Sequence, residues 1–189
     1  MNARLPLVCL LFALALSACA PWALVEPDGR GFSKSRDYTL DMPAGWVKRT
    51  ADVNDLFITR DGPALNYIVV ARQPHDRKLP RTKRETRADM LPYELAELAL
   101  AEWRSNDATA NLEVLSNTPT LLGGKSAIRL HVRYRNERGL PIERLMVALV
   151  DAKGRLSLLY EAPGIVYFQR GLPAFEAMLT SVRFSEQGQ

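Results

Sequence analysis

Few residue groups in this chain have the types and spacing that catalysis requires. Gly124-Lys125-Ser126 resembles the end of a phosphate-binding loop, but Pro119 stands where that motif needs its first glycine, and a strand pattern follows. Neither common serine-nucleophile motif, Gly-x-Ser-x-Gly or Ser-x-x-Lys, occurs in the sequence. We therefore expect a protein that is not an enzyme and that uses no cofactor.

The histidines and the acidic segment near residue 52 do not predict a metal site. His75 and His131 are not at the spacing of helix-borne ligands, and no free thiol accompanies them, so we expect His131 to be a solvated strand residue. The segment from Asp52 to Asp55 lacks the glycine and the distal glutamate of a calcium loop. It is predicted to be a polar turn.

The strongest signal lies at the N-terminus. Arg4 precedes an unbroken apolar run that ends at Leu16, a pattern typical of a secretory signal peptide and too short to span a bilayer comfortably. Leu16-Ser17-Ala18-Cys19 resembles the bacterial lipobox. That resemblance implies cleavage before Cys19 and attachment of fatty acyl chains such as palmitate to it. Residues 1–18 are therefore predicted to be a lipoprotein signal peptide, and the protein to be anchored in the bacterial envelope, facing the periplasm.

The rest of the composition agrees with an exported domain. Cys9 leaves with the signal peptide, so the mature chain has one cysteine and no intramolecular disulfide is possible. Removal of Arg4 lowers the formal net charge of the 189-residue chain from +4 to +3, a balance that does not indicate nucleic-acid binding. Ala20 stands where inner-membrane retention favours aspartate, so the outer membrane is favoured over the inner.

Residues 19–37 are expected to be the lipidated cysteine and a flexible tether, because prolines and glycines interrupt any periodic pattern there. A single globular domain is then predicted over residues 38–184, followed by a tail over residues 185–189. At this length one domain can bury a full core.

Alternating or continuous apolar runs predict the strands. Tyr38 to Met42 alternates strictly, and Leu56–Arg60 and Leu65–Arg72 flank a turn at Asp61 to Ala64, which indicates a hairpin. The continuously apolar runs Tyr67 to Ala71 and Leu145 to Val150 are typical of central strands covered on both faces. From Gly123 onward the pattern predicts a meander.

Two amphipathic patterns predict helices. The first runs from Asp89, as its N-cap, to Ser105, with Leu91, Leu95, Leu98 and Ala99 as its apolar stripe. The second runs from Tyr167 to Thr180, and a short strand over Val182 to Phe184 closes the domain. Strands buried on both faces and two separate helices predict an α+β fold, a three-layer α/β/α sandwich around a central antiparallel sheet.

The order of these elements, from Tyr38-Thr39-Leu40-Asp41-Met42-Pro43-Ala44-Gly45-Trp46 to Ser181-Val182-Arg183-Phe184, resembles the PsbP-like α/β/α sandwich. That superfamily includes extrinsic photosystem subunits and small bacterial lipoproteins. The resemblance covers nearly the whole mature domain and implies an adaptor or binding domain without catalytic residues. It assigns no functional site to particular positions.

Two basic clusters remain as candidates for binding. One lies within residues 72–87, and the other is one face of the strand near residue 131. They are either solvated and neutralised, by Glu137 and Glu143 or by Glu94 and Glu97 of the first helix, or they attract an anionic surface or partner. The candidate residues are Arg77, Lys78, Arg81, Lys83, Arg84, Arg129, His131, Arg133 and Arg135.

The function that these features favour is a lipid-anchored envelope protein that binds or scaffolds another protein. The alternative is a carrier or sensor of an amphiphile or small anionic ligand held between helix and sheet. A partner surface requires an exposed apolar or charged patch, whereas a carrier requires an apolar cavity with a few polar groups.

Overall fold

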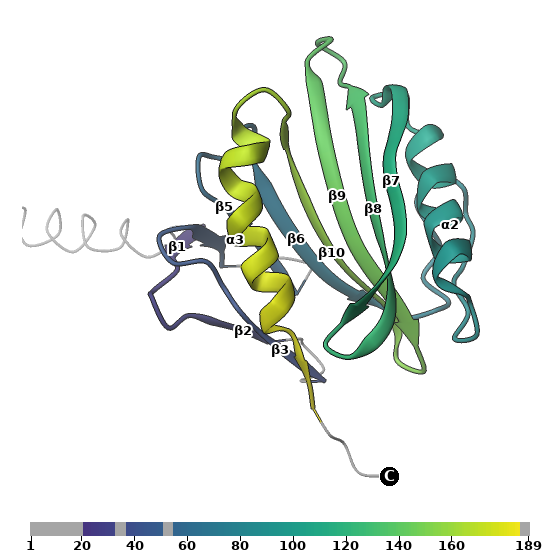
Figure 1. The fold of residues 1–189 in the computed structure, drawn as a ribbon, viewed down its shortest axis with the longest axis horizontal. Coiled ribbons are helices and arrows are strands. Elements are labelled where there is room, and N and C mark those ends of the chain that lie inside the picture. Colours follow the sequence, from purple (N-terminus) through teal and green to yellow (C-terminus); the bar gives the residue numbers. More distant parts are fainter. Residues whose placement is uncertain (1–20, 33–36, 51–54, 186–189) are drawn as a thin grey trace, which may run out of the picture.

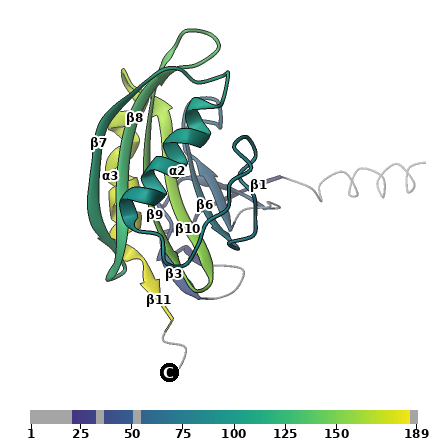
Figure 2. The ribbon, with the colours of Figure 1, turned by 90° about the vertical axis from the view of Figure 1, so that its right-hand side faces the viewer.

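An eight-stranded antiparallel sheet forms the centre of the protein, with one helix on each face (Figure 1; Figure 2). The computed structural model describes residues 21–32, 37–50 and 55–185. In sheet order the strands are β1 (Trp22–Leu24), β4 (Val47–Arg49), β5 (Leu56–Thr59), β6 (Tyr67–Gln73), β10 (Gly154–Pro163), β9 (Pro141–Asp151), β8 (Lys125–Arg135) and β7 (Ala110–Leu122). The helices are α2 (Pro92–Arg104) and α3 (Tyr167–Ser181).

A second, smaller sheet has three strands in the order β11 (Arg183–Phe184), β3 (Tyr38–Asp41) and β2 (Arg30–Phe32). It packs beside α3 and brings β2 and β3, from the first part of the chain, next to the last strand, β11 (Figure 1). The predicted three-layer sandwich is confirmed. The predicted signal peptide, Cys19 and residues 186–189 of the tail lie outside the described residues.

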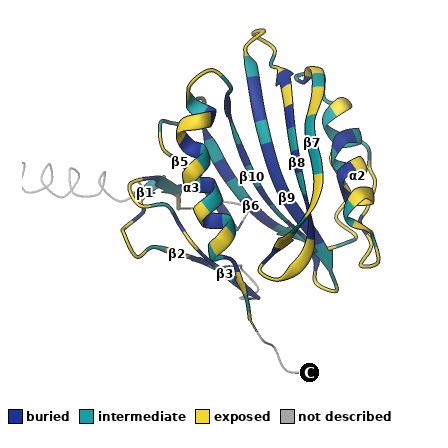
Figure 3. Ribbon diagram, in the orientation of Figure 1, coloured by how far each residue is buried: buried dark blue, intermediate teal, exposed yellow. Residues whose placement is uncertain are grey.

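The two central apolar runs have the positions that their composition predicts. On β9, Leu145, Val147 and Leu149 point into the core beneath α3, while Met146 and Ala148 point into the core beneath α2. Because side chains alternate between the two faces, a strand covered by a helix on each side must be apolar at every position. Figure 3 shows this as buried residues that run along the middle strands.

The strand β10 follows β9 through a tight two-residue turn that requires glycine at its end. Gly154 has a φ of +114°, a conformation that L side chains rarely adopt. A Cβ atom there would lie 2.2 Å from the carbonyl oxygen of Gln73. The turn therefore packs against the end of β6, and it lies beside the polar cluster described below.

The expected tether is wrong for the described part of residues 19–37. Trp22 to Leu24 pair with Val47 to Arg49, and Arg30 to Phe32 pair with β3. Val25 is 2% exposed and belongs to the α3-side core. Pro27 and Gly29 lie in the turn between β1 and β2, so paired strands are present about 16 residues earlier than the sequence pattern indicates.

The first helix also begins later than predicted. Asp89 is not its N-cap: the helix starts at Pro92, and Glu94 accepts a hydrogen bond from the Leu91 N–H at 2.7 Å. Proline suits this first position because its missing N–H needs no partner there. Leu91, which the apolar stripe included, lies before the helix and is 65% exposed. Asp89 instead pairs with Arg87 at 3.2 Å.

Candidate functional site

The loop between β6 and α2 holds the first basic cluster rigidly against the helix. Leu79 is buried in the α2-side core. Glu102 of α2 accepts hydrogen bonds from the N–H groups of Arg81 at 2.8 Å and Thr82 at 2.9 Å, and from the Thr82 hydroxyl at 2.9 Å. Burial opposes ionisation of Glu102, but these donors outweigh it and hold the pKa of the carboxyl below its ordinary value.

The five cationic side chains that the sequence singles out on this loop all reach solvent. Lys78 lies 3.8 Å from Glu85, an exposed pair of little energetic weight, and Lys83 Nζ donates to the Pro80 carbonyl at 2.6 Å. Within residues 21–32, 37–50 and 55–185, neither Arg77 nor Arg84 forms an ion pair. The loop thus presents positive charge on a fixed backbone. We call residues 77–87 the basic loop.

A groove of about 550 Å³ separates the basic loop from the N-terminal half of α2. Met90 and Leu98 supply apolar surface, and Tyr93 at its side is 52% exposed. Arg84 and Arg87 line the opposite wall, where Arg87 also pairs with Asp89 and Glu94. Glu85, Glu94 and Glu97 also line the groove, so its walls carry charges of both signs around an apolar floor. The excess of positive charge lies beside the groove, on the basic loop, where it is suited to acidic residues of a segment whose apolar side chain enters the groove.

The second basic cluster lies on the other face of the sheet and does not join the first. Ile128, Leu130 and Val132 of β8 point toward α2, so the basic residues that alternate with them point toward α3. Glu94 and Glu97 of α2 therefore cannot cover these basic residues. That rules out one of the neutralising arrangements that the sequence left open. The nine candidate residues form two separate sets.

The strand cations are paired on the α3 side. Glu176 of α3 binds Arg129 through both guanidinium nitrogens, one of them at 3.1 Å. Glu143, which is 6% exposed, accepts a hydrogen bond from Arg133 at 3.0 Å. This is the neutralisation by Glu143 that the sequence offered as one alternative. Arg135 donates to the Gly139 carbonyl at 2.8 Å. Two of the three strand arginines, Arg129 and Arg133, are therefore neutralised by carboxylates, whereas the exposed Arg135 is bonded to a carbonyl oxygen and keeps its charge.

His131 is not the solvated residue that the alternation predicts. Its side chain is 22% exposed, its Nε2 atom lies 2.8 Å from Glu143, and its ring stacks on Phe168 of α3 with centroids 5.1 Å apart. Glu143 is one of the neutralising neighbours that the sequence suggested, whereas the sequence could not place Phe168, which lies on a helix far along the chain.

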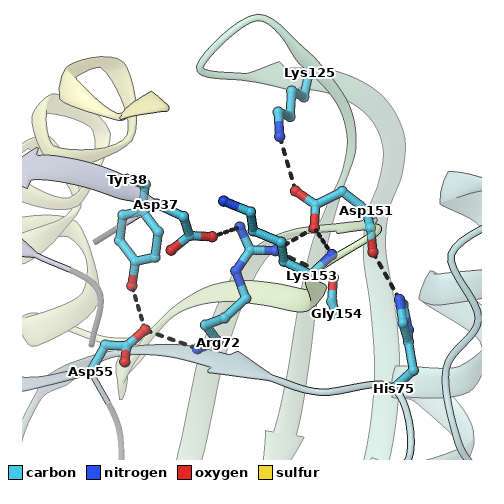
Figure 4. A network of polar contacts seen from close by, with 9 residues as sticks. All are labelled: Asp37, Tyr38, Asp55, Arg72, His75, Lys125, Asp151, Lys153 and Gly154. Carbon is cyan, nitrogen blue, oxygen red and sulfur yellow. Dashed lines mark hydrogen bonds and ion pairs between the residues drawn. The ribbon is translucent and has the colours of Figure 1, made fainter. Parts of the chain in front are cut away.

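Arg72, counted with the basic cluster in the sequence, is buried in a separate polar cluster (Figure 4). Its guanidinium lies 2.8 Å from Asp37 and 2.8 Å from Asp151. Asp55 accepts hydrogen bonds from the Arg72 N–H at 3.1 Å and the Tyr38 hydroxyl at 2.7 Å. The cluster joins the segment before β3, the end of β6 and the turn after β9. Asp52 to Asn54 of the predicted polar turn lie outside the described residues.

The cluster in Figure 4 extends to two further turns of the sheet. Lys125 binds Asp151 at 2.9 Å, and His75 Nε2 donates to the Asp151 carbonyl at 2.8 Å while Nδ1 accepts from Thr86. Burial opposes ionisation of Asp151, but Lys125, the Lys153 N–H and Arg72 outweigh it and hold its pKa below the ordinary value. With its charges paired, the cluster is suited to fastening elements together.

A second groove, of about 540 Å³, opens between the C-terminal half of α3 and the β7–β8 hairpin. Leu122, Val147, Leu179 and Val182 give it an apolar floor. Arg129, Glu176 and Arg183 lie on its walls. Its volume is in the range of small-ligand sites.

Other features of the described residues add no chemistry. Within them, no group of three or more His, Cys, Asp or Glu residues is placed to hold a metal ion, and no helix is long and apolar enough to cross a membrane. The groove beside the basic loop is what sequence reasoning missed. Its one sequence signal is Tyr93, an aromatic residue outside the predicted apolar stripe of the helix.

Comparison with known proteins shows the fold and no more. No protein-family model and no curated protein matches the chain. The cyanobacterial PsbP protein CyanoP from Synechocystis sp. PCC 6803 is similar in structure, with a TM-score of 0.53 and 13% identity over 89% of this chain and 95% of that one. The Saccharomyces cerevisiae Ran-binding protein Mog1p has a TM-score of 0.55 and 10% identity over 82% of this chain and 94% of that one.

A structure from Bacteroides thetaiotaomicron gives a TM-score of 0.49 and 10% identity over 85% of this chain, which spans about half of that protein, 49% of its length. The likenesses to CyanoP and Mog1p confirm that the sandwich is of the PsbP/Mog1-like type.

Proposed function

We propose that the protein is a lipid-anchored envelope lipoprotein that acts as a non-catalytic interaction module in the periplasm. The lipobox-like residues Leu16 to Cys19 support the anchor, and Ala20 favours the outer membrane. The observation that carries the interaction role is the basic loop, whose cations stand on a backbone fixed by Glu102 beside an apolar groove. The partner is a protein segment with acidic residues and an apolar side chain.

The fold suits this role. In the PsbP/Mog1-like sandwich the helices and sheet close two cores, so the loops are free to vary without loss of the scaffold. Mog1p, which has the same fold, is a Ran-binding protein. A binding surface on a rigid loop loses little conformational entropy when the partner docks.

Site-specific photo-crosslinking in intact envelopes tests the interaction. A photoreactive phenylalanine at Tyr93 should crosslink a partner, whereas the same group at Ile165, which is 76% exposed in the turn before α3, should not. Changing Arg77, Lys78, Arg81, Lys83 and Arg84 to Gln should abolish the Tyr93 product. Crosslinking that is equal at both positions, or that survives the five substitutions, would refute the basic loop as the binding surface.

The anchor has its own test. Cys19→Ala should abolish incorporation of a clickable fatty acid, read by gel fluorescence, while the parent is labelled. Equal labelling of the two proteins would remove the lipoprotein assignment.

The groove beneath α3 supports the second candidate, a carrier of a small amphiphile. A fluorescent dodecanoate should bind the parent protein and be displaced by unlabelled fatty acid. Leu179→Trp should fill the groove and weaken binding at least tenfold, whereas Ile165→Trp, at a position 76% exposed in the turn before α3 and outside the groove lining, should leave it unchanged. Absence of saturable binding by the parent would exclude this function.

A further inference from the structure

Backbone pairing with β4 and the turn after it involves residues as close as two positions after Cys19. The Thr50 N–H donates to the Pro21 carbonyl at 3.0 Å, and the Val25 N–H donates to Trp46 at 2.8 Å. Between these two bonds, β1 pairs with β4. Since consecutive Cα atoms are at most about 3.8 Å apart, Cys19 can lie no more than about 8 Å from Pro21. An acyl anchor on Cys19 would therefore bring the β1 edge of the sheet to the membrane.

The surface at this edge combines aromatic, aliphatic and cationic groups. The Arg49 guanidinium lies over the rings of Phe57, at 4.3 Å, and Trp22, at 5.4 Å, and these rings meet edge to face at 5.9 Å. Leu24, two residues along β1 and so on the same face as Trp22, is 58% exposed. We call Trp22, Leu24, Arg49 and Phe57 the β1 surface.

Neither helix covers the β1 surface. Leu56 and Ile58 point into the α3-side core, so Phe57 between them points to the opposite face. On that face α2 packs against β7, β8 and β9, at the other end of the sheet. The strands β1, β4 and β5 therefore present these side chains outward.

We propose that the β1 surface rests on the headgroup region of the membrane and fixes the orientation of the domain. The inference rests on the proposed acylation of Cys19. Tryptophan prefers the boundary between headgroups and acyl chains, and arginine keeps its charge at the headgroups while its stem lies on apolar surface. The charge of Arg49 also favours anionic lipids. Only Ala20 lies between Cys19 and Pro21, so an acyl anchor on Cys19 would hold the β1 surface at the membrane. This short connection favours the membrane over a protein as the partner of the β1 surface.

A fluorescent probe at the β1 surface can test this in the acylated, full-length protein. Since the mature chain has no cysteine besides Cys19, Leu24→Cys gives a single site for an environment-sensitive NBD probe. The matched control is Leu121→Cys, at a position 70% exposed within β7, the strand farthest from β1 in the sheet order. Seven strand spacings separate the two edges by roughly 34 Å. Both proteins are reconstituted in phosphatidylethanolamine–phosphatidylglycerol vesicles with a headgroup-proximal spin-labelled lipid.

We expect the probe at position 24 to shift to the blue and to lose at least half of its emission to the spin label, while the probe at position 121 is unaffected. Arg49→Gln should reduce the quenching at position 24. Equal quenching at the two positions, or a blue shift at position 24 without quenching, would overturn the proposal. Fatty-acid labelling of the same samples separates the two levels: unlabelled protein refutes the anchor, whereas labelled protein without quenching refutes only the β1 surface.

Discussion

Replacing Arg72 by methionine should destabilise the protein strongly at neutral pH and less strongly below the ordinary range of a carboxyl group. Methionine fills a similar volume but leaves the Asp37 carboxylate, whose side chain is 2% exposed, without the guanidinium 2.8 Å away. Removing one member of a buried ion pair costs about 3–5 kcal/mol because the other charge stays buried. The side chain of Asp151 is 18% exposed and keeps its ion pair with Lys125, so loss of the Arg72–Asp151 pair adds little to the cost.

The pH dependence follows from Asp151, whose pKa in the parent is held below the ordinary value by Lys125, the Lys153 N–H and Arg72. Its contribution to stability is present above the ordinary range of the carboxyl and is lost as the pH falls through the lower, folded-state value. The part that Arg72 supplies is missing from the variant, so the two proteins come closer only when the pH falls below about 4.

Urea unfolding followed by circular dichroism, on the chain from Ala20 onward, measures both quantities. A chain that begins at Ser33 is unsuitable because it lacks β1 and β2. We expect a loss of about 3–5 kcal/mol at pH 7, equivalent to roughly 10 °C in Tm, and a smaller loss at about pH 3, below the ordinary range of the carboxyl. A loss below about 1 kcal/mol at pH 7, or one that does not change with pH, would show that the cluster does not hold these elements together.

Three further substitutions probe the core and the basic loop. Val147→Asp places a carboxylate at a position 2% exposed and should cost several kcal/mol in thermal unfolding; a shift of less than about 2 °C would contradict a central β9. Gly171→Ala sets a Cβ 2.3 Å from the Tyr160 hydroxyl and should cost about 1–3 kcal/mol by urea unfolding, an expectation that parent-like stability would exclude. Glu102→Gln should speed hydrogen exchange of the Thr82 amide at least tenfold, while exchange of the Val147 amide stays unchanged. Unchanged Thr82 exchange would mean that other contacts hold the loop.

The long elements were predictable because their patterns are local. Central strands covered on both faces are apolar throughout, and α3 buries Phe168, Phe175 and Met178 at helical spacing. Three-residue strands such as β1 are too short to show periodicity. The 13-residue strand β7 was missed because one bulge falls before Glu113 and another before Ser116, so the alternation changes phase.

The candidate site was predictable only in part. Composition identifies the basic loop, but its groove depends on how α2 packs, and the sequence does not show that the strand cations lie on the opposite face. Their pairing depends on Glu143 and Glu176, which approach β8 only in the folded sheet. Local patterns specify which residues are basic, and tertiary packing decides which of them remain unpaired.

The pairing of β1 also determines how the protein responds to a mechanical load on its N-terminus. Three residue pairs join β1 to β4, whereas seven join β6 to β10 in the middle of the sheet. A pull on the N-terminus would open the shorter ladder first. Releasing the segment from Pro21 to Gly29 would lengthen the chain by roughly 30 Å while β2 and the rest of the domain stay folded. The β1–β4 pairing would then be the mechanically weakest part of the sheet, which separates under tension before the domain unfolds.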